Sequence, residues 1–337
     1  MGVKNLNSLI EKYSPNGKLR QHLSVFNGMT FAVDTNVYLY KYLYGKSNHI
    51  DGMFFMVNKF KKFGITPIFI FDGKPPTEKT NTIIQRREAK QKLHDRILDL
   101  KSQSINSDDG QEIKDEISNI EKRIVFVSID IIQSTKELFD LMGVSYIEAT
   151  SEAEQYCAKL NHMGLVSGVV SEDMDTIACG AKIVLRNFSN RDDMVDVYYL
   201  DNILTEMNIS YDSFIDMCIL LGNDYIQRPK GYTPTEIYMD IMEYQRIESV
   251  LNNRENVKLG NNIPRLRDLY LIKEVDVDET IIYEQKNKKW DTINLLNYMK
   301  ENSSIDETTI KHRINKMYNS FSMSLNSPIS KNYNFWR

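Results

Sequence analysis

The sequence has few cysteines and histidines, and it has no long apolar run. Its 337 residues include three cysteines and five histidines, and Cys157, Cys179 and Cys218 do not have the spacing of a metal site. We therefore expect reduced core thiols in an intracellular, reducing compartment. No stretch of about 18 apolar residues is present, which argues against a membrane span. The N-terminal residues also lack the apolar core of a signal peptide.

A surplus of basic residues is lacking as well. The chain has 42 Lys and Arg residues against 46 Asp and Glu residues, which gives a formal net charge of −4. This balance argues against a simple basic nucleic-acid binder. Seven of the acidic residues are assigned below to one metal site, and setting them aside leaves 39 acidic against 42 basic residues. The rest of the surface is then slightly basic.

Three short apolar runs, which predict buried strands of a mostly parallel sheet, are each followed by aspartate. These aspartates are Asp34, Asp72 and the pair Asp173 and Asp175. Ligands of open α/β sheets bind at the carboxyl ends of the strands, so we expect the aspartates to lie at one edge. Carboxylates that converge there repel one another unless a cation lies between them. The alternative is a polar turn in which Asp173 caps the next helix.

Two predicted helices add further carboxylates. Glu152 and Glu154 open the helix at 151–160, and Asp224 follows the apolar helix that ends at Gly222. Ser151 and Glu154 also match a capping box, and Asp224 by itself is typical of a turn. Because no His or Cys joins these carboxylates, Mg²⁺ or Mn²⁺ is predicted rather than Zn²⁺. Seven carboxylates exceed what one Mg²⁺ takes, whereas two ions about 3.5–4 Å apart suit phosphodiester hydrolysis.

The segment 77–100 predicts a basic helix, in which Lys79, Arg86 and Lys90 share one face. Because this helix follows Asp72 closely, its cations can overhang the metal site and grip a phosphate; the alternative is a solvated basic face. Residues 102–110 predict a flexible break, and residues 111–122 a solvated acidic helix with little to bury. Residues 37–44 fit a strand and a helix equally well.

The chain resembles the flap endonuclease family of structure-specific 5′ nucleases. The matching segments follow the family's order over roughly residues 1–225: MGVKNL, AVDTNVYLY, GITPIFIFDGKPP, LMGVSYIEATSEAEQYCAKL, VVSEDMDTIACGAKIVLRN and FIDMCILLGNDY. The resemblance implies an α/β core of the 5′ nuclease, PIN-like type, with a mostly parallel central sheet flanked by helices. It also implies a helical arch at about 77–128, a helical duplex-binding region at 226–318 and a polar tail at 319–337.

The resemblance also implies roles for individual residues. Asp72 and Glu154, helped by Asp34 and Glu152, would hold one Mg²⁺, and Asp173 and Asp175, helped by Asp224, would hold a second; Mn²⁺ is expected to substitute. Lys79 and Arg86 match the catalytic cations of the arch. Gly2 matches a small residue that lets the N-terminus approach DNA, and Tyr40 matches a tyrosine that stacks on a base beside the cut. Lys90, Lys230 and Gly231 are further candidates for DNA contacts.

Three departures from the family pattern stand out. Met56 replaces an arginine, which removes one expected phosphate contact. The turn that grips duplex DNA, Gly-Ile-Gly-Pro-Lys in the family, here reads GYTPT at 231–235. No sliding-clamp motif of the Gln-x-x-hydrophobic-x-x-aromatic-aromatic type lies near the end of the sequence. The chain is therefore expected to be a compact, divergent member. A viral source would place it in the cytoplasm; otherwise nucleus and cytoplasm are not distinguished.

The sequence therefore predicts a Mg²⁺-dependent endonuclease that cleaves 5′ flaps or related branched DNA in replication, repair or recombination. Cleavage should leave a 3′-hydroxyl and a 5′-phosphate, and 5′–3′ exonuclease action would use the same site. A junction resolvase or a mainly exonucleolytic enzyme is the alternative within this class. A non-catalytic scaffold is disfavoured because all seven carboxylates are present, and an RNA endonuclease is disfavoured by the arch and the Asp224 motif.

Overall fold

The computed structural model describes residues 2–44, 47–104, 110–122, 124–254, 257–259, 262–273, 275–277 and 290–325. In this part of the chain seven strands form one sheet in the order β1-β7-β6-β5-β2-β3-β4. The strands are β1 (Lys18–His22), β2 (Thr30–Asp34), β3 (Thr66–Phe71), β4 (Ser145–Glu148), β5 (Gly168–Val170), β6 (Ile183–Arg186) and β7 (Met194–Tyr199). Strands β2 to β6 pair in parallel, and β7 runs antiparallel to β6 and β1. The predicted mostly parallel sheet is confirmed.

Two layers of helices cover the sheet, because successive residues of its central strands point to opposite faces. Ala32 belongs to one buried cluster, whereas its neighbours Phe31 and Val33 belong to the other. The helices of the first layer are α1 (Leu6–Tyr13), α7 (Ala153–His162), α8 (Asp175–Ala178), α9 (Leu200–Met207) and α10 (Tyr211–Leu221). The second layer holds α2 (Thr35–Tyr44), α3 (His49–Lys62) and α6 (Ile129–Leu141). Short 3₁₀ turns, η1 (Leu23–Phe26) and η2 (Thr77–Lys79), precede β2 and α4 respectively.

The ambiguous segment 37–44 is the helix α2. Tyr38 and Leu39 are fully buried within the second layer, whereas Tyr44 is exposed. The alternation of tyrosines that suggested a strand therefore does not reflect the periodicity of burial. No helix in the described part of the chain is long and apolar enough to cross a membrane.

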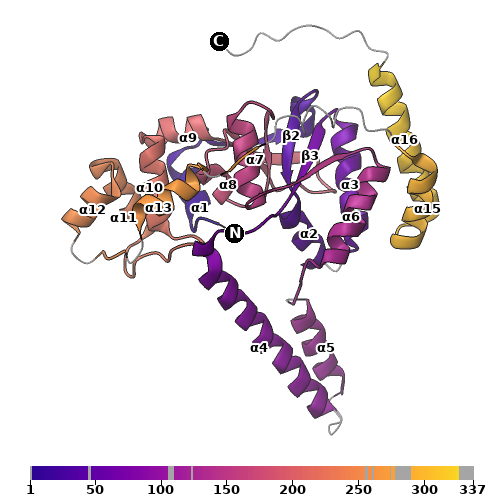
Figure 1. The fold of residues 1–337 in the computed structure, drawn as a ribbon, viewed down its shortest axis with the longest axis horizontal. Coiled ribbons are helices and arrows are strands. Elements are labelled where there is room, and N and C mark those ends of the chain that lie inside the picture. The colour runs from indigo at the N-terminus through magenta and orange to yellow at the C-terminus, as the bar shows by residue number, and fades with distance from the viewer. Residues whose placement is uncertain are drawn as a thin grey trace.

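Helices beyond residue 226 divide between the two layers (Figure 1). The helices α11 (Pro234–Tyr244), α12 (Ile247–Asn253) and α13 (Ile263–Tyr270) pack with α10 in the first layer. The helices α15 (Thr292–Asn302) and α16 (Glu307–Leu325) pack against α6 and α3 in the second. The predicted region 226–318 is thus two groups of helices on opposite faces, and its role with duplex DNA stays a prediction. Residues 326–337 of the predicted polar tail lie outside the described residues.

The segment 77–122 forms a hairpin of two long helices, α4 (Thr80–Ser104) and α5 (Gly110–Glu121), which projects from the body (Figure 1). The expectation that its acidic half has little to bury is wrong. Ile113, Ile117 and Ile120 of α5 pack against Ile97 and Leu100 of α4 in a small separate core. These isoleucines recur at helical spacing, so the acidic composition concealed a narrow apolar stripe.

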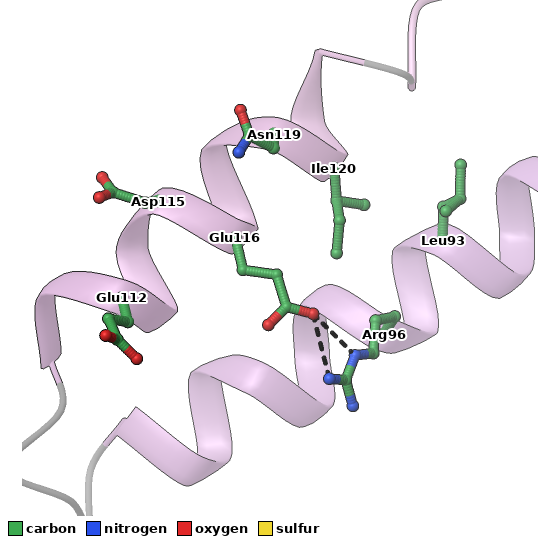
Figure 2. A pocket seen from close by; sticks show the side chains of 7 residues that line it. All are labelled: Leu93, Arg96, Glu112, Asp115, Glu116, Asn119 and Ile120. Carbon is green, nitrogen blue, oxygen red and sulfur yellow. Dashed lines mark hydrogen bonds and ion pairs between the residues drawn. The ribbon is translucent and has the colours of Figure 1, made fainter.

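Polar side chains flank this small core, as Figure 2 shows for the open pocket between α4 and α5. Arg96 of α4 pairs with Glu116 of α5, with 3.0 Å between Nη2 and Oε1. Both side chains are about half exposed, so the pair adds little to stability. Helix α4 continues to Ser104, into the predicted break at 102–110, and α5 begins at Gly110; residues 105–109 lie outside the described residues.

Candidate metal and nucleic-acid site

Asp34 and Asp72 lie at the carboxyl ends of the neighbouring strands β2 and β3, as predicted. Ser171, which follows β5, donates its hydroxyl to Asp34 Oδ2 at 2.8 Å. The backbone N–H of Ala153 donates to Asp72 Oδ1 at 2.9 Å. Asp72 therefore satisfies an amide at the first turn of α7, a task often performed by a side chain of the helix's own N-cap.

The capping-box alternative for Ser151 and Glu154 is therefore wrong. The N-cap of α7 is Glu152, which makes no side-chain capping bond, and the buried hydroxyl of Ser151 has no hydrogen-bond partner in the structure. Because a neighbouring strand supplies the capping carboxylate, Glu154 faces the acidic cluster instead of the helix end. Both glutamates are buried.

Asp173 and Asp175 follow β5 and are buried as well. The backbone N–H of Asp175 donates to Asp173 Oδ1 at 3.0 Å, so the predicted local turn exists beside any role in metal binding. Both carboxylate oxygens of Asp175 are buried without a hydrogen-bond partner. Buried polar groups are usually paired, so this carboxylate indicates a ligand that binds in the cluster.

The carboxylates lie close enough to raise one another's pKa. Burial raises the pKa of Asp34 well above its usual range, and Asp72 raises it further. Burial is also the main cause for Glu154 and Asp175, with added repulsion from Glu152 and Asp173 respectively. A cation among these groups would favour their charged forms.

Lys79 supplies the positive charge that the protein itself brings to this cluster. Its Nζ forms an ion pair with Glu152 and lies 3.8 Å from Glu154 Oε1 and 3.3 Å from Asp224 Oδ2. Burial alone would lower the pKa of Lys79, but the attraction of Glu154 and Glu152 outweighs it and raises the pKa. Arg86 Nη2 lies 2.6 Å from Asp224 Oδ1. The two arch cations therefore converge on the carboxylates, as their spacing predicts.

The donor set fits a hard divalent cation. Its members are carboxylates only, Asp175 has unpaired oxygens, and the ammonium group of Lys79 stands where positive charge is required. Among the described residues, no three His, Cys, Asp or Glu side chains are already arranged to hold a metal ion. The ammonium group of Lys79 therefore lies among the carboxylates that a cation would bind.

Sequence reasoning missed Tyr225. Its hydroxyl donates to Glu152 Oε2 at 2.9 Å, and its side chain is buried between the cluster and Tyr270. Its position directly after Asp224 was the signal that could have revealed it. Tyr225 fixes the direction of Glu152, whose other oxygen pairs with Lys79.

Gly2 lies against the acidic cluster. A Cβ atom at this position would stand 2.0 Å from Asp173 Oδ1 and 2.7 Å from the Asp175 backbone nitrogen, and the φ angle is +78°. Only glycine fits such a position without displacing both aspartates. Gly2, Arg86 and Asp224 line one shallow pocket, so the N-terminal residues border the site.

Tyr40 and Lys90 lie together where the arch meets the body. Lys90 Nζ lies 5.6 Å from the centroid of the Tyr40 ring and 4.2 Å from that of Phe126. The same group donates to the Val125 carbonyl at 2.6 Å. The two predicted DNA-binding residues therefore lie side by side, and their contacts with DNA stay a prediction.

The turn before α11 is capped by its own side chains. Gly231 has a φ angle of +74° and open space around it, and Lys230 beside it is exposed. Thr233 is the N-cap of α11, and Glu236 accepts the Thr233 N–H at 2.9 Å and its hydroxyl at 2.6 Å. Met56 is fully buried in the second layer, so no DNA contact comes from this position.

Comparison with known proteins places the chain in a family. Residues 1–93 match the XPG N-terminal domain, and residues 143–224 match the XPG I-region. Flap endonuclease 1 of Heterostelium pallidum is 30% identical over 345 residues, which cover 94% of this chain and 85% of that protein. The chain belongs to the flap endonuclease family. Flap endonuclease 1 of Entamoeba histolytica is 29% identical over 340 residues, covering 95% and 88% of the two chains.

Solved structures with the flap endonuclease fold superpose on most of the chain. The catalytic core of Rad2 in complex with DNA substrate has a TM-score of 0.71 at 24% identity, covering 93% of this chain and 99% of that one. Flap endonuclease-1 from Methanococcus jannaschii has a TM-score of 0.68 at 22% identity, covering 94% and 99%. Human GEN1 in complex with Holliday junction DNA has a TM-score of 0.62 at 18% identity, covering 98% and 81%. The predicted 5′ nuclease fold is confirmed.

Proposed function

We propose that this structure-specific nuclease of branched DNA cleaves 5′ flaps and uses two Mg²⁺ ions, for which Mn²⁺ can substitute. The observation that carries the proposal is the cluster of carboxylates at one edge of the sheet: Asp34, Glu152, Glu154, Asp173 and Asp175 are buried there, and Asp72 and Asp224 are more exposed. Lys79 within the cluster and Arg86 at the border of the cluster offset part of its negative charge. We propose an intracellular, reducing compartment as well, which the buried and unpaired cysteines support.

Each carboxylate has a part in holding the cations. Asp72 and Glu154, with Asp34 and Glu152, form one group, and Asp173, Asp175 and Asp224 form the second. Divalent cations held by these groups would supply a water molecule activated for attack and positive charge beside the phosphate. A hydrogen bond from Tyr225 orients Glu152, and one from Ser171 orients Asp34. Attack with departure of the 3′-oxygen leaves a 3′-hydroxyl on one product and a 5′-phosphate on the other.

Lys79 and Arg86 have a second partner in this scheme. In the free protein they pair with carboxylates that the cations would neutralise. The other role that we propose for the two side chains is to donate to the oxygens of the scissile phosphate. Donors that meet charge developing in the transition state accelerate the chemical step.

The test is a cleavage panel of end-labelled 5′ flap, nicked, gapped, four-way-junction and RNA substrates in Mg²⁺. Asp173→Asn should abolish cleavage while leaving DNA affinity within about tenfold, because it removes a metal ligand and few DNA contacts. Asp216→Asn is the matched control: Asp216 is equally buried but pairs with Arg267 outside the cluster. Wild-type turnover by Asp173→Asn would contradict the site, and preference for four-way junctions would contradict flap specificity.

A further inference from the structure

The linker between α15 and α16, residues 303–306, is fastened to the first turn of α3. The side-chain hydroxyl of Ser303 donates to Asp51 Oδ1 at 2.5 Å. The backbone N–H of Ser304 donates to Asp51 Oδ2 at 3.2 Å, and the hydroxyl of Ser304 donates to the same oxygen. Asp51 is only 8% exposed, so the linker directs its donors at a nearly buried carboxylate. We call this arrangement the Asp51 clip.

The contacts of the helix pair itself are of another kind. Leu295 and Met299 of α15 and Ile310 of α16 are fully buried in the second layer. Polar contacts lie at the linker end, where Asn48 Nδ2 also donates to the Asn302 carbonyl at 2.5 Å. Exposed segments held by polar contacts open at a lower cost than an apolar core does. The linker can therefore open locally while the apolar contacts of α15 and α16 stay in place.

Ser304 is the member of the clip that reaches solvent. Ser304 is exposed, whereas Ser303 is half-buried. Residues 303–306 lie between two helices, so an enzyme can take up this segment without unfolding a strand of the sheet. Asp306 and Glu307 follow Ser304 at the second and third positions. Charge patterns of this type direct protein kinases to their substrates.

A phosphate on Ser304 would reverse the hydrogen-bonding role of this side chain. The hydroxyl donates to Asp51, and an ionised carboxylate can only accept. A phosphoserine carries a charge of about −1.5 to −2 at pH 7 and accepts hydrogen bonds through its oxygens. Two anionic acceptors in contact repel each other. The start of α3 offers little compensation, because Asn48 Oδ1 already accepts the Ile50 N–H at 2.9 Å.

The lysines nearest in sequence are already engaged. Lys300 Nζ lies 2.9 Å from Glu307 Oε1, and Lys311 Nζ lies 2.6 Å from the same oxygen. Drawing either lysine to a phosphate on Ser304 would break its pair with Glu307. The phosphate therefore gains little from these cations and meets the charge of Asp51.

We propose that Ser304 is a phosphorylation site and that its phosphate releases the linker from α3. A protein kinase that selects acidic residues after the serine acts on the open linker with ATP. Ser304 Oγ forms a bond to the γ-phosphorus of ATP, and the bond from that phosphorus to the β–γ bridging oxygen breaks. ADP leaves, and the hydroxyl proton passes to the carboxylate base of the kinase. The phosphate then keeps the Asp51 clip from closing, so the modification holds the linker open.

Phosphate transfer to the intact protein is the first test. The full chain is incubated with ATP and a serine kinase that selects acidic substrates, and mass spectrometry locates the phosphate. We expect phosphate at Ser304, its loss in Ser304→Ala and slower transfer in Glu307→Gln. Absence of phosphate at Ser304 in the native protein, or transfer only to the unfolded chain, would overturn the proposal.

The second test measures what the phosphate does to the helix pair. Phosphoserine is introduced at position 304 by genetic encoding, and amide hydrogen exchange is followed at the end of α15 and the start of α16. The phosphate should speed this exchange at least about tenfold, because two charges in contact repel strongly near a protein surface. Thr308→phosphoserine is the matched control, since Thr308 is exposed in the first turn of α16 and the structure records no hydrogen bond from it to Asp51. This control should change the exchange little.

Asp51→Asn separates repulsion by Asp51 from a general effect of the phosphate. The asparagine amide can donate to a phosphate, which the aspartate cannot do. In the Asp51→Asn background, phosphate on Ser304 should therefore change the exchange by less than about threefold. Thermal melts of the unphosphorylated Asp51→Asn protein confirm that it is folded. Equal acceleration by the phosphate in both backgrounds, or acceleration in neither, would overturn the proposal.

Discussion

The carboxylate edge of the sheet and the turn before α11 differ in whether their polar groups have hydrogen-bond partners. At the carboxylate edge, Asp175 is buried with both oxygens unpaired, and the pKa values of Asp34 and Glu154 are raised by burial. At the turn, Glu236 and Thr233 satisfy one another's backbone groups. The carboxylate edge keeps buried oxygens unpaired, whereas the turn pairs its own polar groups.

This difference bears on where function resides in a divergent chain. A helix N-terminus binds phosphate through free backbone N–H groups. Here the carboxylate of Glu236 already accepts the Thr233 N–H, and its negative charge would repel a phosphate. The carboxylate edge, by contrast, keeps both oxygens of Asp175 unpaired. We therefore expect strong effects from changes at the edge and weak effects at the turn.

The largest expected effect comes from Asp175→Asn. It should abolish cleavage and also raise the melting temperature of the metal-free protein by at least about 2 °C, because it removes a buried charge that lacks a partner. Activity assays and thermal melts in chelator check both outcomes. A variant that loses both activity and metal-free stability would show that Asp175 has a structural role. The carboxylate edge would then not differ from the turn in having an unsatisfied polar group.

Arg86→Ala should lower the single-turnover rate on a flap substrate by about 10²-fold while affinity changes by less than tenfold. Arg86 pairs with Asp224, whereas its exposed neighbour Arg87 makes no contact with the cluster that the structure records. Arg87→Ala is thus the matched control and should cleave at nearly the wild-type rate. If Arg86→Ala loses affinity and keeps its rate, the solvated-face alternative is correct.

The stability of the metal-free protein should depend on pH through the cluster. Carboxyl groups in the unfolded chain have a pKa near about 4, whereas burial raises the pKa of Glu154 and Asp175 in the folded chain. The folded state then binds more protons above about pH 4, so its stability falls as pH rises. Mg²⁺ replaces these protons and should raise the melting temperature more at about pH 8 than at about pH 5.5. An equal shift at both values would contradict the assignment.

The smallest expected effects concern the turn. Replacing K⁺ by a bulky organic cation at fixed ionic strength should change flap affinity little, and the salt slope should be about one unit shallower than for a family member with lysine at this turn. Glu236→Gln removes a negative charge and should strengthen binding by a few-fold at most. A sharp loss of affinity without K⁺ would mean that the turn keeps an ion site, and the comparison with the carboxylate edge would fail.

Sequence reasoning predicted the elements whose signal is local. The strands that end in Asp34 and Asp72 were visible as short apolar runs, and the helix of Lys79 and Arg86 through its spacing. The capping of α7 was not, because Asp72 reaches it from a strand 81 residues away in sequence. Strand β1 was missed because Lys18–His22 is a largely polar edge strand. The stripe of isoleucines on α5 was missed because acidic composition was given more weight than periodicity.

The helical hairpin of the arch has a consequence for the cooperativity of unfolding. Its buried residues, Ile97, Leu100 and Ile120, form a cluster separate from the two that cover the sheet. A few apolar contacts stabilise a hairpin much less than a domain core stabilises its helices. Amide hydrogens at the middle of α4 and α5 should therefore exchange through a sub-global opening in which the sheet remains intact. The arch can then melt and reform many times during the lifetime of one folded molecule.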